Sequence, residues 1–241
     1  MFSTTWCRSL TTSLFSRGRD WLNWPFDRPM LLIFYMPVSK FISIFITIFI
    51  VGINVQKNAG TKVLLLSSGG VDSTALLDFY LRTRNEVECL HFQYGQKNAK
   101  SEKEAFNKIL SHYKVNGRII DLGFVPCKSS YEVSCRNALF VLIAASINES
   151  PLRLALGIHE DSRYYDCSRR FIDDCQKILD GYFAGTVRVE APFIGFKKSE
   201  IIVYCKNFKV PTNLTYSCLR QNSPPCGQCP ACLDNKELYE G

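Results

Sequence analysis

A short apolar run that leads directly into a glycine-rich turn constrains the fold of this chain more than any other feature. Residues 62–66 (Lys-Val-Leu-Leu-Leu) are followed by residues 67–70 (Ser-Ser-Gly-Gly), the pattern of a buried parallel strand that ends in a loop. A helix is expected next, with Ser73 as its N-cap and apolar side chains on one face at Leu76, Leu77, Tyr80 and Leu81. Glycines let the backbone approach an anion, and N–H groups at a helix start point toward it. The turn therefore predicts a phosphate-binding loop.

Strands and helices alternate through the rest of the chain. The sequence predicts further strands at 86–92, 118–122, 152–158 and 187–191, and helices at 98–113, 137–148, 168–182 and 199–207. Such alternation is typical of an α/β fold with a doubly wound, mainly parallel sheet. Ligands of these sheets bind at the carboxyl ends of the strands, so the residues that follow each strand are the candidate site residues.

Four of the 11 cysteines form a compact array near the C-terminus, with the spacing C-x7-C-x2-C-x2-C: Cys218, Cys226, Cys229 and Cys232. Four thiolates at these spacings can surround one Zn2+ tetrahedrally, which predicts a small C-terminal zinc-binding segment at 218–232. An iron–sulfur cluster or free reactive thiols are the alternatives, and the compact spacing favours structural zinc. The other cysteines show no regular framework, which favours a reducing compartment and a cytoplasmic protein.

The N-terminal 60 residues differ from the rest and are interpreted as an apolar extension that precedes one domain at 61–241. Residues 30–53 are long and apolar enough to span a bilayer. The arginines before them and the lysines after them would leave the domain outside the cytoplasm, which disfavours membrane association. A start codon placed too early and a leader are the alternatives, since residues 1–19 resemble a transit peptide.

Charge helps to exclude some partners. The net charge is +7, but residues 61–241 hold 23 basic and 20 acidic side chains. This small excess suits a nucleotide-binding cleft and does not by itself predict a nucleic-acid surface, so no direct nucleic-acid contact is expected.

The phosphate loop also indicates which nucleotide chemistry to expect. Residues 68–73 (Ser-Gly-Gly-Val-Asp-Ser) lack the lysine of a Walker A loop. They resemble instead the signature of the PP-loop family, the N-type ATP pyrophosphatases, which transfer AMP to an acceptor oxygen. The resemblance implies that ATP lies on this loop, that Ser68, Gly69, Gly70, Val71 and Ser73 hold its phosphates, and that Asp72 orients the loop or helps to hold Mg2+.

Together with the cysteine array, further short motifs resemble one PP-loop branch, the QueC-like 7-cyano-7-deazaguanine synthase family. These motifs are YGQ at 94–96, RN at 136–137, YDC at 165–167, which is similar to a YPDC segment with tyrosine in place of proline, and a K-x-E-I helix start that aligns Lys198. The resemblance covers nearly all of residues 62–235. It implies substrate contacts at Tyr94, Gln96, Arg136, Asn137 and Asp166.

Lys198 and His159 are two further catalytic candidates, and each has an alternative interpretation. Lys198 can neutralise a phosphate, or it can be a solvated helix start. His159 follows a strand, where it can meet the substrate or transfer a proton, although a lone histidine is more often structural. Among the implied substrate contacts, Tyr94 can simply pack and Asp166 can cap the helix near Ser168.

The chain departs from the family pattern in three places. The 123–135 segment is short, Asn235 stands where family members often have arginine, and the chain ends at Gly241. These departures affect the identity of the substrate and the oligomeric packing more than ATP use.

The resemblance implies an ATP-dependent ligase that converts 7-carboxy-7-deazaguanine and ammonia to 7-cyano-7-deazaguanine, through an acyl adenylate and an amide, in queuosine biosynthesis. It also allows for a homodimer. Two alternatives remain open at this point: a QueC-like enzyme that joins a deazaguanine to a protein amine in antiphage defence, and a PP-loop tRNA-modifying enzyme.

Overall fold

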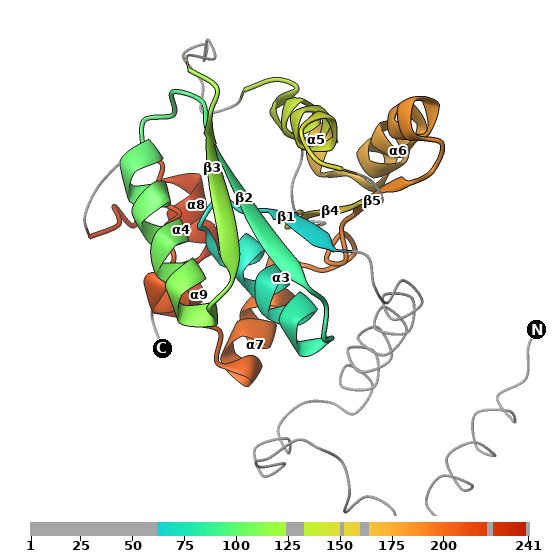
Figure 1. Cartoon of the computed structure of the whole chain (residues 1–241). Helices are drawn as coiled ribbons and strands as arrows, with labels where there is room; N and C mark the ends of the chain where they lie inside the picture. Colours follow the sequence, from blue (N-terminus) through green and yellow to red (C-terminus); the bar gives the residue numbers. More distant parts are fainter. Residues whose placement is uncertain (1–61, 124–132, 150–151, 160–163, 221–223, 240–241) are drawn as a thin grey trace, which may run out of the picture. The chain divides into compact units, whose positions relative to one another are not determined.

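A five-stranded parallel sheet forms the centre of the protein in the computed structural model (Figure 1), which describes residues 62–123, 133–149, 152–159, 164–220 and 224–239. The strands are β1 (Val63–Leu66), β2 (Val87–Gln93), β3 (Asn116–Asp121), β4 (Leu152–Leu156) and β5 (Val187–Glu190). The longer helices are α3 (Val71–Arg82), α4 (Ala99–Tyr113), α5 (Arg136–Ser146), α6 (Arg169–Phe183) and α7 (Lys198–Phe208). Two short helices, α8 (Pro230–Asp234) and α9 (Lys236–Tyr239), follow, and two 3-10 turns are η3 (Tyr165–Cys167) and η4 (Thr212–Leu214).

The strand order β3-β2-β1-β4-β5 places a topological switch point at the centre of the sheet. From β1 the chain moves outward to β2 and β3, then returns to the other side of β1 as β4, in the register Val63↔Arg153 to Leu66↔Leu156. The loops after β1 and β4 therefore leave the same edge of the sheet side by side, which is where doubly wound folds bind ligands. The predicted α/β fold is confirmed.

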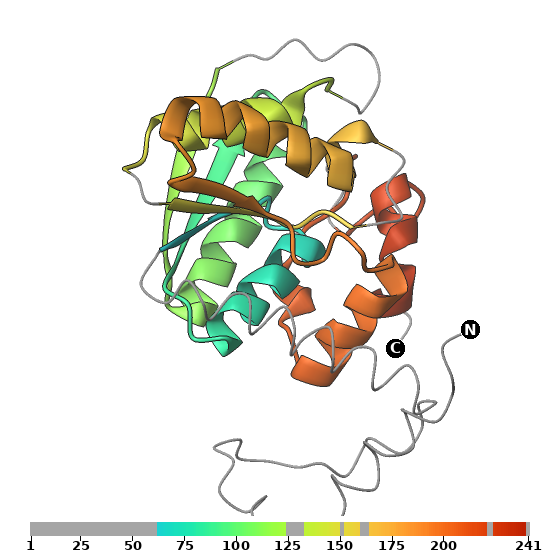
Figure 2. The same ribbon diagram turned by 90° about the vertical axis from the view of Figure 1, so that its right-hand side faces the viewer.

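Helices cover both faces of the sheet (Figure 2), and an apolar core lies on each face. Along β1, Val63 and Leu65 pack on the side of α3, α4 and α7, whereas Leu64 packs on the side of α5 and α6. This alternation follows from the period of two in a strand, and burial on both faces explains why residues 63–66 are continuously apolar.

The first helix starts earlier than the sequence pattern predicts. α3 begins at Val71 with Gly70 as its N-cap, and among the described residues no side chain caps it. The expectation that Ser73 is the N-cap is wrong: its Oγ lies in the first turn and donates to the Gly70 carbonyl at 3.1 Å. The helix N-terminus thus keeps its N–H groups directed at the loop and uncovered by a capping side chain.

Several N-terminal predictions fall outside the described residues. The extension at 1–60 and the apolar stretch at 30–53 belong to the undescribed part, and so does most of the short 123–135 segment. Across the described ranges, none of the helices has the length and hydropathy needed to cross a membrane. The division into an extension and a domain at 61–241 stays a prediction.

A buried carboxylate ties together the three helices on one face. Asp78 of α3 accepts hydrogen bonds from the Tyr204 hydroxyl of α7 at 2.9 Å and the Tyr113 hydroxyl of α4 at 3.2 Å, and it pairs with Arg82. Burial raises the pKa of Tyr204, and the Asp78 charge raises it further, so both hydroxyls stay protonated donors. The network holds the helices that carry the residues of the candidate site.

Asp78→Ala should lower the free energy of unfolding by about 2–4 kcal/mol, because two tyrosine hydroxyls and Arg82 lose their shared acceptor. Urea denaturation measures the difference. Asp173→Ala removes an exposed carboxylate from α6 and is the matched control, expected to change stability by no more than about 0.5 kcal/mol. Equal losses of unfolding free energy in the two variants would contradict a stabilising role of the Asp78 hydrogen bonds.

Candidate functional site

The loop between β1 and α3 is held by backbone hydrogen bonds from three parts of the chain. The Ser67 N–H donates to the Leu90 carbonyl of β2 at 2.9 Å, and the Gly69 carbonyl accepts from the Tyr216 N–H at 2.9 Å. The Gly70 carbonyl accepts from the Thr74 N–H at 3.1 Å and from the Thr74 hydroxyl at 2.8 Å. The loop backbone is thus fixed before any ligand arrives.

Two glycines allow the neighbouring elements to approach this loop closely. Gly69 has φ +79°, and a Cβ there would lie 2.8 Å from the Glu102 carbonyl oxygen of α4. Gly157, just after β4, lies against the first turn of α3, where a Cβ would be 3.0 Å from the Ser73 nitrogen. Both contacts are with backbone atoms, so a larger residue could not be accommodated by a side-chain rearrangement.

The predicted catalytic residues Asp72 and Lys198 meet beside the loop. Lys198 Nζ lies 2.5 Å from Asp72 Oδ1, which joins the first turn of α7 to the first turn of α3. The Lys198 side chain is 11% exposed and that of Asp72 is 27% exposed. The alternative of a solvated helix start at Lys198 is therefore wrong. A buried ammonium next to a helix N-terminus can bind an anion, and the carboxylate can hold a divalent cation.

Gln96 supports the loop after β2 through three hydrogen bonds inside the protein. Its Oε1 accepts from the Tyr94 N–H at 2.8 Å, and its Nε2 donates to the Phe92 carbonyl at 3.3 Å and to Glu102 Oε2 at 2.9 Å. Gln96, which is predicted to contact the substrate, thus fixes the position of Tyr94 in this structure.

Tyr94 and Arg136 line a small cavity. The Tyr94 hydroxyl accepts from Arg136 Nη1 at 3.4 Å, and its ring lies 5.4 Å from that of Phe140. The cavity has a volume of about 160 Å³ and is lined by Tyr94 together with Val133, Ser134, Cys135, Arg136, Leu139 and Phe140. An aromatic ring and a guanidinium beside an apolar wall can bind a flat, polar molecule.

Asn137 and Asp166 lie next to this pair. Asn137 Nδ2 donates to the Asp166 carbonyl at 3.0 Å. Burial lowers the pKa of Arg136, but Tyr94, Asp166 and Cys167 oppose this effect, and the net pKa lies above its usual value. Arg136 is therefore a permanent cation. The idea that Asp166 caps α6 is wrong, since the cap is Ser168, whose Oγ accepts from the Phe171 N–H at 3.1 Å.

His159 follows β4, as predicted, and is partly buried. Its Nδ1 is buried and has no hydrogen-bond partner within the described part of the chain. The role of His159 in substrate contact or proton transfer stays a prediction.

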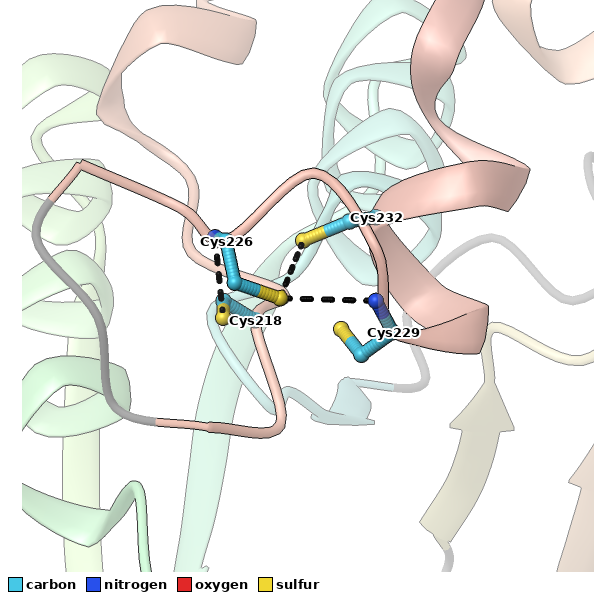
Figure 3. A group of neighbouring side chains, drawn as sticks. All are labelled: Cys218, Cys226, Cys229 and Cys232. Carbon is cyan, nitrogen blue, oxygen red and sulfur yellow. Dashed lines mark hydrogen bonds between the residues drawn. The ribbon is translucent and has the colours of Figure 1, made fainter.

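The four C-terminal cysteines converge on one point (Figure 3). Their sulfur atoms all lie within 4.8 Å of one another, and Cys226 Sγ is 3.9 Å from Cys232 Sγ. A tetrahedral ion with bonds of about 2.3 Å needs sulfurs about 3.8 Å apart, so the cluster fits a metal ion. Backbone N–H groups of Gln228 and Cys229 lower the pKa of the Cys226 thiol, which favours the thiolate that a metal binds.

Two residues that sequence reasoning missed, Asn98 and Glu102, join the cysteine cluster to the loop between β1 and α3. The buried Asn98 donates from Nδ2 to Glu102 Oε1 at 2.8 Å and to the Cys218 carbonyl at 3.4 Å. Burial raises the pKa of Glu102, although Gln96, Arg136 and Asn98 lower it in part. The position of Asn98 just after the YGQ turn was the available signal.

A family model described as queuosine biosynthesis protein QueC matches residues 62–132 and 127–241. The 7-cyano-7-deazaguanine synthase of Nautilia profundicola is 30% identical over 203 residues, which cover 71% of this chain and 90% of the relative. That of Aquifex aeolicus is 30% identical over 220 residues, covering 77% and 99%. That of Archaeoglobus fulgidus is 31% identical over 209 residues, covering 74% and 85%.

A solved structure supports the fold assignment. The U34-tRNA thiolase NcsA from Methanococcus maripaludis, with its 4Fe-4S cluster, superimposes with a TM-score of 0.51 at 14% identity, covering 80% of this chain and 71% of that protein. At this identity the likeness extends to the fold alone.

Gly69→Ala should reduce the free energy of unfolding by about 2–4 kcal/mol, because the methyl group would meet the α4 backbone and a positive φ is unfavourable for alanine. Gly123→Ala is the matched control. Gly123 also has a positive φ of +68°, but none of the described residues lies within 4 Å of a Cβ there, so only the conformational cost of about 1 kcal/mol is expected. Similar losses in the two variants, measured by urea denaturation, would show that the close approach of α4 is unimportant.

Proposed function

We propose, because this chain belongs to the QueC family of queuosine biosynthesis proteins, that it is an ATP-dependent carbon–nitrogen ligase that produces 7-cyano-7-deazaguanine from 7-carboxy-7-deazaguanine. The observation that carries the proposal is the family match, which extends over all of the described residues. Relatives that bear this synthase name align with 85–99% of their own length. The anchored loop between β1 and α3 supplies the chemistry that such a reaction needs.

Mg-ATP is proposed to lie on residues 68–73. The N-terminus of α3, which no side chain caps among the described residues, offers N–H groups to the phosphates, and Gly69 and Gly70 add no side chain of their own to the loop. Asp72 and Lys198 neutralise each other in the structure described here. With Mg-ATP bound, the carboxylate would turn to Mg2+ and the ammonium to a phosphate, so each would exchange one charged partner for another.

The deazaguanine is proposed to bind beside Arg136. The aromatic rings of Tyr94 and Phe140 can contact the flat base, and the permanent positive charge of Arg136 can pair with a carboxylate. Asn137 and Asp166 complete the polar side of this region, and Gln96 contributes by holding Tyr94. His159 is proposed as a further polar contact at the carboxyl end of β4.

The chemistry proceeds in two rounds. A carboxylate oxygen attacks the α-phosphorus of ATP and diphosphate leaves, which gives an acyl adenylate. Ammonia attacks the acyl carbon, and AMP and a proton leave, which gives the amide. The amide oxygen is adenylated by a second ATP, and loss of AMP and a proton gives the nitrile. The protein positions the reactants and neutralises the phosphate charge, so no covalent nucleophile is needed.

The thiolate quartet is proposed to hold structural Zn2+. The zinc would supply folding free energy to the segment that donates the Tyr216 N–H to the loop. Residues 1–60 are proposed to contribute nothing to the site, since the sheet begins at β1 and the family match begins at residue 62. The protein is also proposed to be cytoplasmic and to form a homodimer.

The reaction can be tested by mass spectrometry and AMP quantification. The purified protein, incubated with ATP, Mg2+, ammonium and 7-carboxy-7-deazaguanine, should form the nitrile and release about two AMP per nitrile, one for each adenylation. One AMP per base, with no nitrile at saturating ammonium, would contradict the synthase and point to an acceptor other than ammonia, such as a protein amine.

About one equivalent of zinc per chain should copurify, since four converging thiolates form a closed tetrahedral site. Cys229→Ser should lose the metal and lower the melting temperature, because metal binding contributes to folding. Cys135→Ser replaces an exposed cysteine outside the cluster and should keep the zinc. Iron and sulfide in stoichiometric amounts, measured by elemental analysis, would contradict the zinc assignment.

A further inference from the structure

The imidazole of His91 is buried directly behind the phosphate loop. His91 belongs to β2, is 1% exposed, and has its Nδ1 2.9 Å from the Ser67 carbonyl oxygen. A carbonyl oxygen only accepts hydrogen bonds, so Nδ1 carries the proton and donates it. The bond therefore identifies the tautomer of His91 and connects the second strand to the first residue of the loop.

This hydrogen bond lies just beyond the last paired residues of β1 and β2. The pairing of β1 with β2 ends at Leu66↔Leu90, and the Ser67 N–H still donates to the Leu90 carbonyl. The Ser67 carbonyl is held by the His91 side chain. Because a trans peptide is planar, the direction of this carbonyl also sets the opposite direction of the Ser68 N–H. His91 thereby orients the Ser68 N–H, the first N–H group of residues 68–73.

The ring is itself held in place by α4. It stacks on Phe106, with ring centroids 5.2 Å apart and an angle of 28° between the planes. The Phe106 backbone nitrogen would be 3.1 Å from a Cβ on Gly69. The imidazole thus lies between the sheet and the helix that packs against the glycine turn, and it cannot shift without moving one of them.

Packing alone does not require a histidine here. The Nε2 atom is buried and finds no hydrogen-bond partner among the described residues, which is unfavourable for a polar atom. An apolar side chain of similar size would fill the same space without this cost. What the histidine provides, and an apolar residue would lack, is the N–H group directed at Ser67.

We infer that His91 is a positioning residue for nucleotide binding, which holds the Ser67 carbonyl so that the loop presents its N–H groups to the phosphates of ATP. The inference rests on the proposed function, because it takes the nucleotide to lie on residues 68–73. His91 acts through Ser67 and does not itself contact the substrate.

Two substitutions separate the donor from the packing. In His91→Asn the amide Nδ2 is attached to Cγ, as Nδ1 is in histidine, so an N–H donor can be kept at that position. His91→Leu fills the space without a donor. Binding of Mg-ATP to the full-length protein is measured by calorimetry, under conditions where circular dichroism shows each variant to be folded.

The leucine variant should bind Mg-ATP about 5–10-fold more weakly, the effect of one lost hydrogen bond, and the asparagine variant should stay within about twofold of the wild type. In the ligase assay, KM for ATP should rise in the same proportion with little change in kcat, since the loop holds the phosphates in ground and transition state alike. If the leucine variant does not fold, His91→Met repeats the test with a flexible apolar side chain.

A folded leucine or methionine variant that binds Mg-ATP as tightly as the wild type would overturn the inference and leave His91 a purely structural residue. An asparagine variant as weak as the leucine variant would also overturn it, because the donor would then not be the cause. Failure of the wild-type protein to bind Mg-ATP would instead overturn the proposed function, and the inference with it.

Discussion

The backbone of α4 lies so close to Gly69 that a single side-chain carbon there would come within 2.8 Å of the Glu102 carbonyl. Three sets of contacts hold the loop: this approach of α4, the hydrogen bond from the Tyr216 N–H to the Gly69 carbonyl, and the contacts of Ser67 with β2. A loop fixed in this way needs little rearrangement to bind an anion, so little conformational entropy opposes binding. The switch point of the sheet then places Gly157 and the first turn of α3 against each other beside it.

The same contacts connect the cysteine cluster with the loop between β1 and α3. Tyr216 and Ser217 stand just before Cys218, and Asn98 bridges the Cys218 carbonyl and Glu102. Folding of the cysteine segment around an ion would therefore also hold one wall of the loop. The proposed metal would then be structural and would still affect the loop, because the segment that carries it donates a hydrogen bond to the loop backbone.

Much of this arrangement could be predicted from local sequence. The apolar run before Ser67, the glycine turn and the cysteine spacing are each contained within short segments, and the structure confirms the strand, the loop and the metal-compatible cluster. The N-cap of α3 was misplaced by three residues, because Ser73 bonds back to Gly70 from inside the first turn. The roles of Asn98 and His91 depend on partners 120 and 24 residues away, and no local pattern specifies such contacts.

The proposed reaction begins when a carboxylate oxygen of the substrate attacks the α-phosphorus of an ATP held on the loop after β1. Isotope transfer tests it most directly. If 7-carboxy-7-deazaguanine with both carboxylate oxygens replaced by 18O is the substrate, AMP from each round should carry one 18O atom, because the attacking oxygen leaves with AMP. Unlabelled AMP, or ADP with labelled phosphate, would contradict the account.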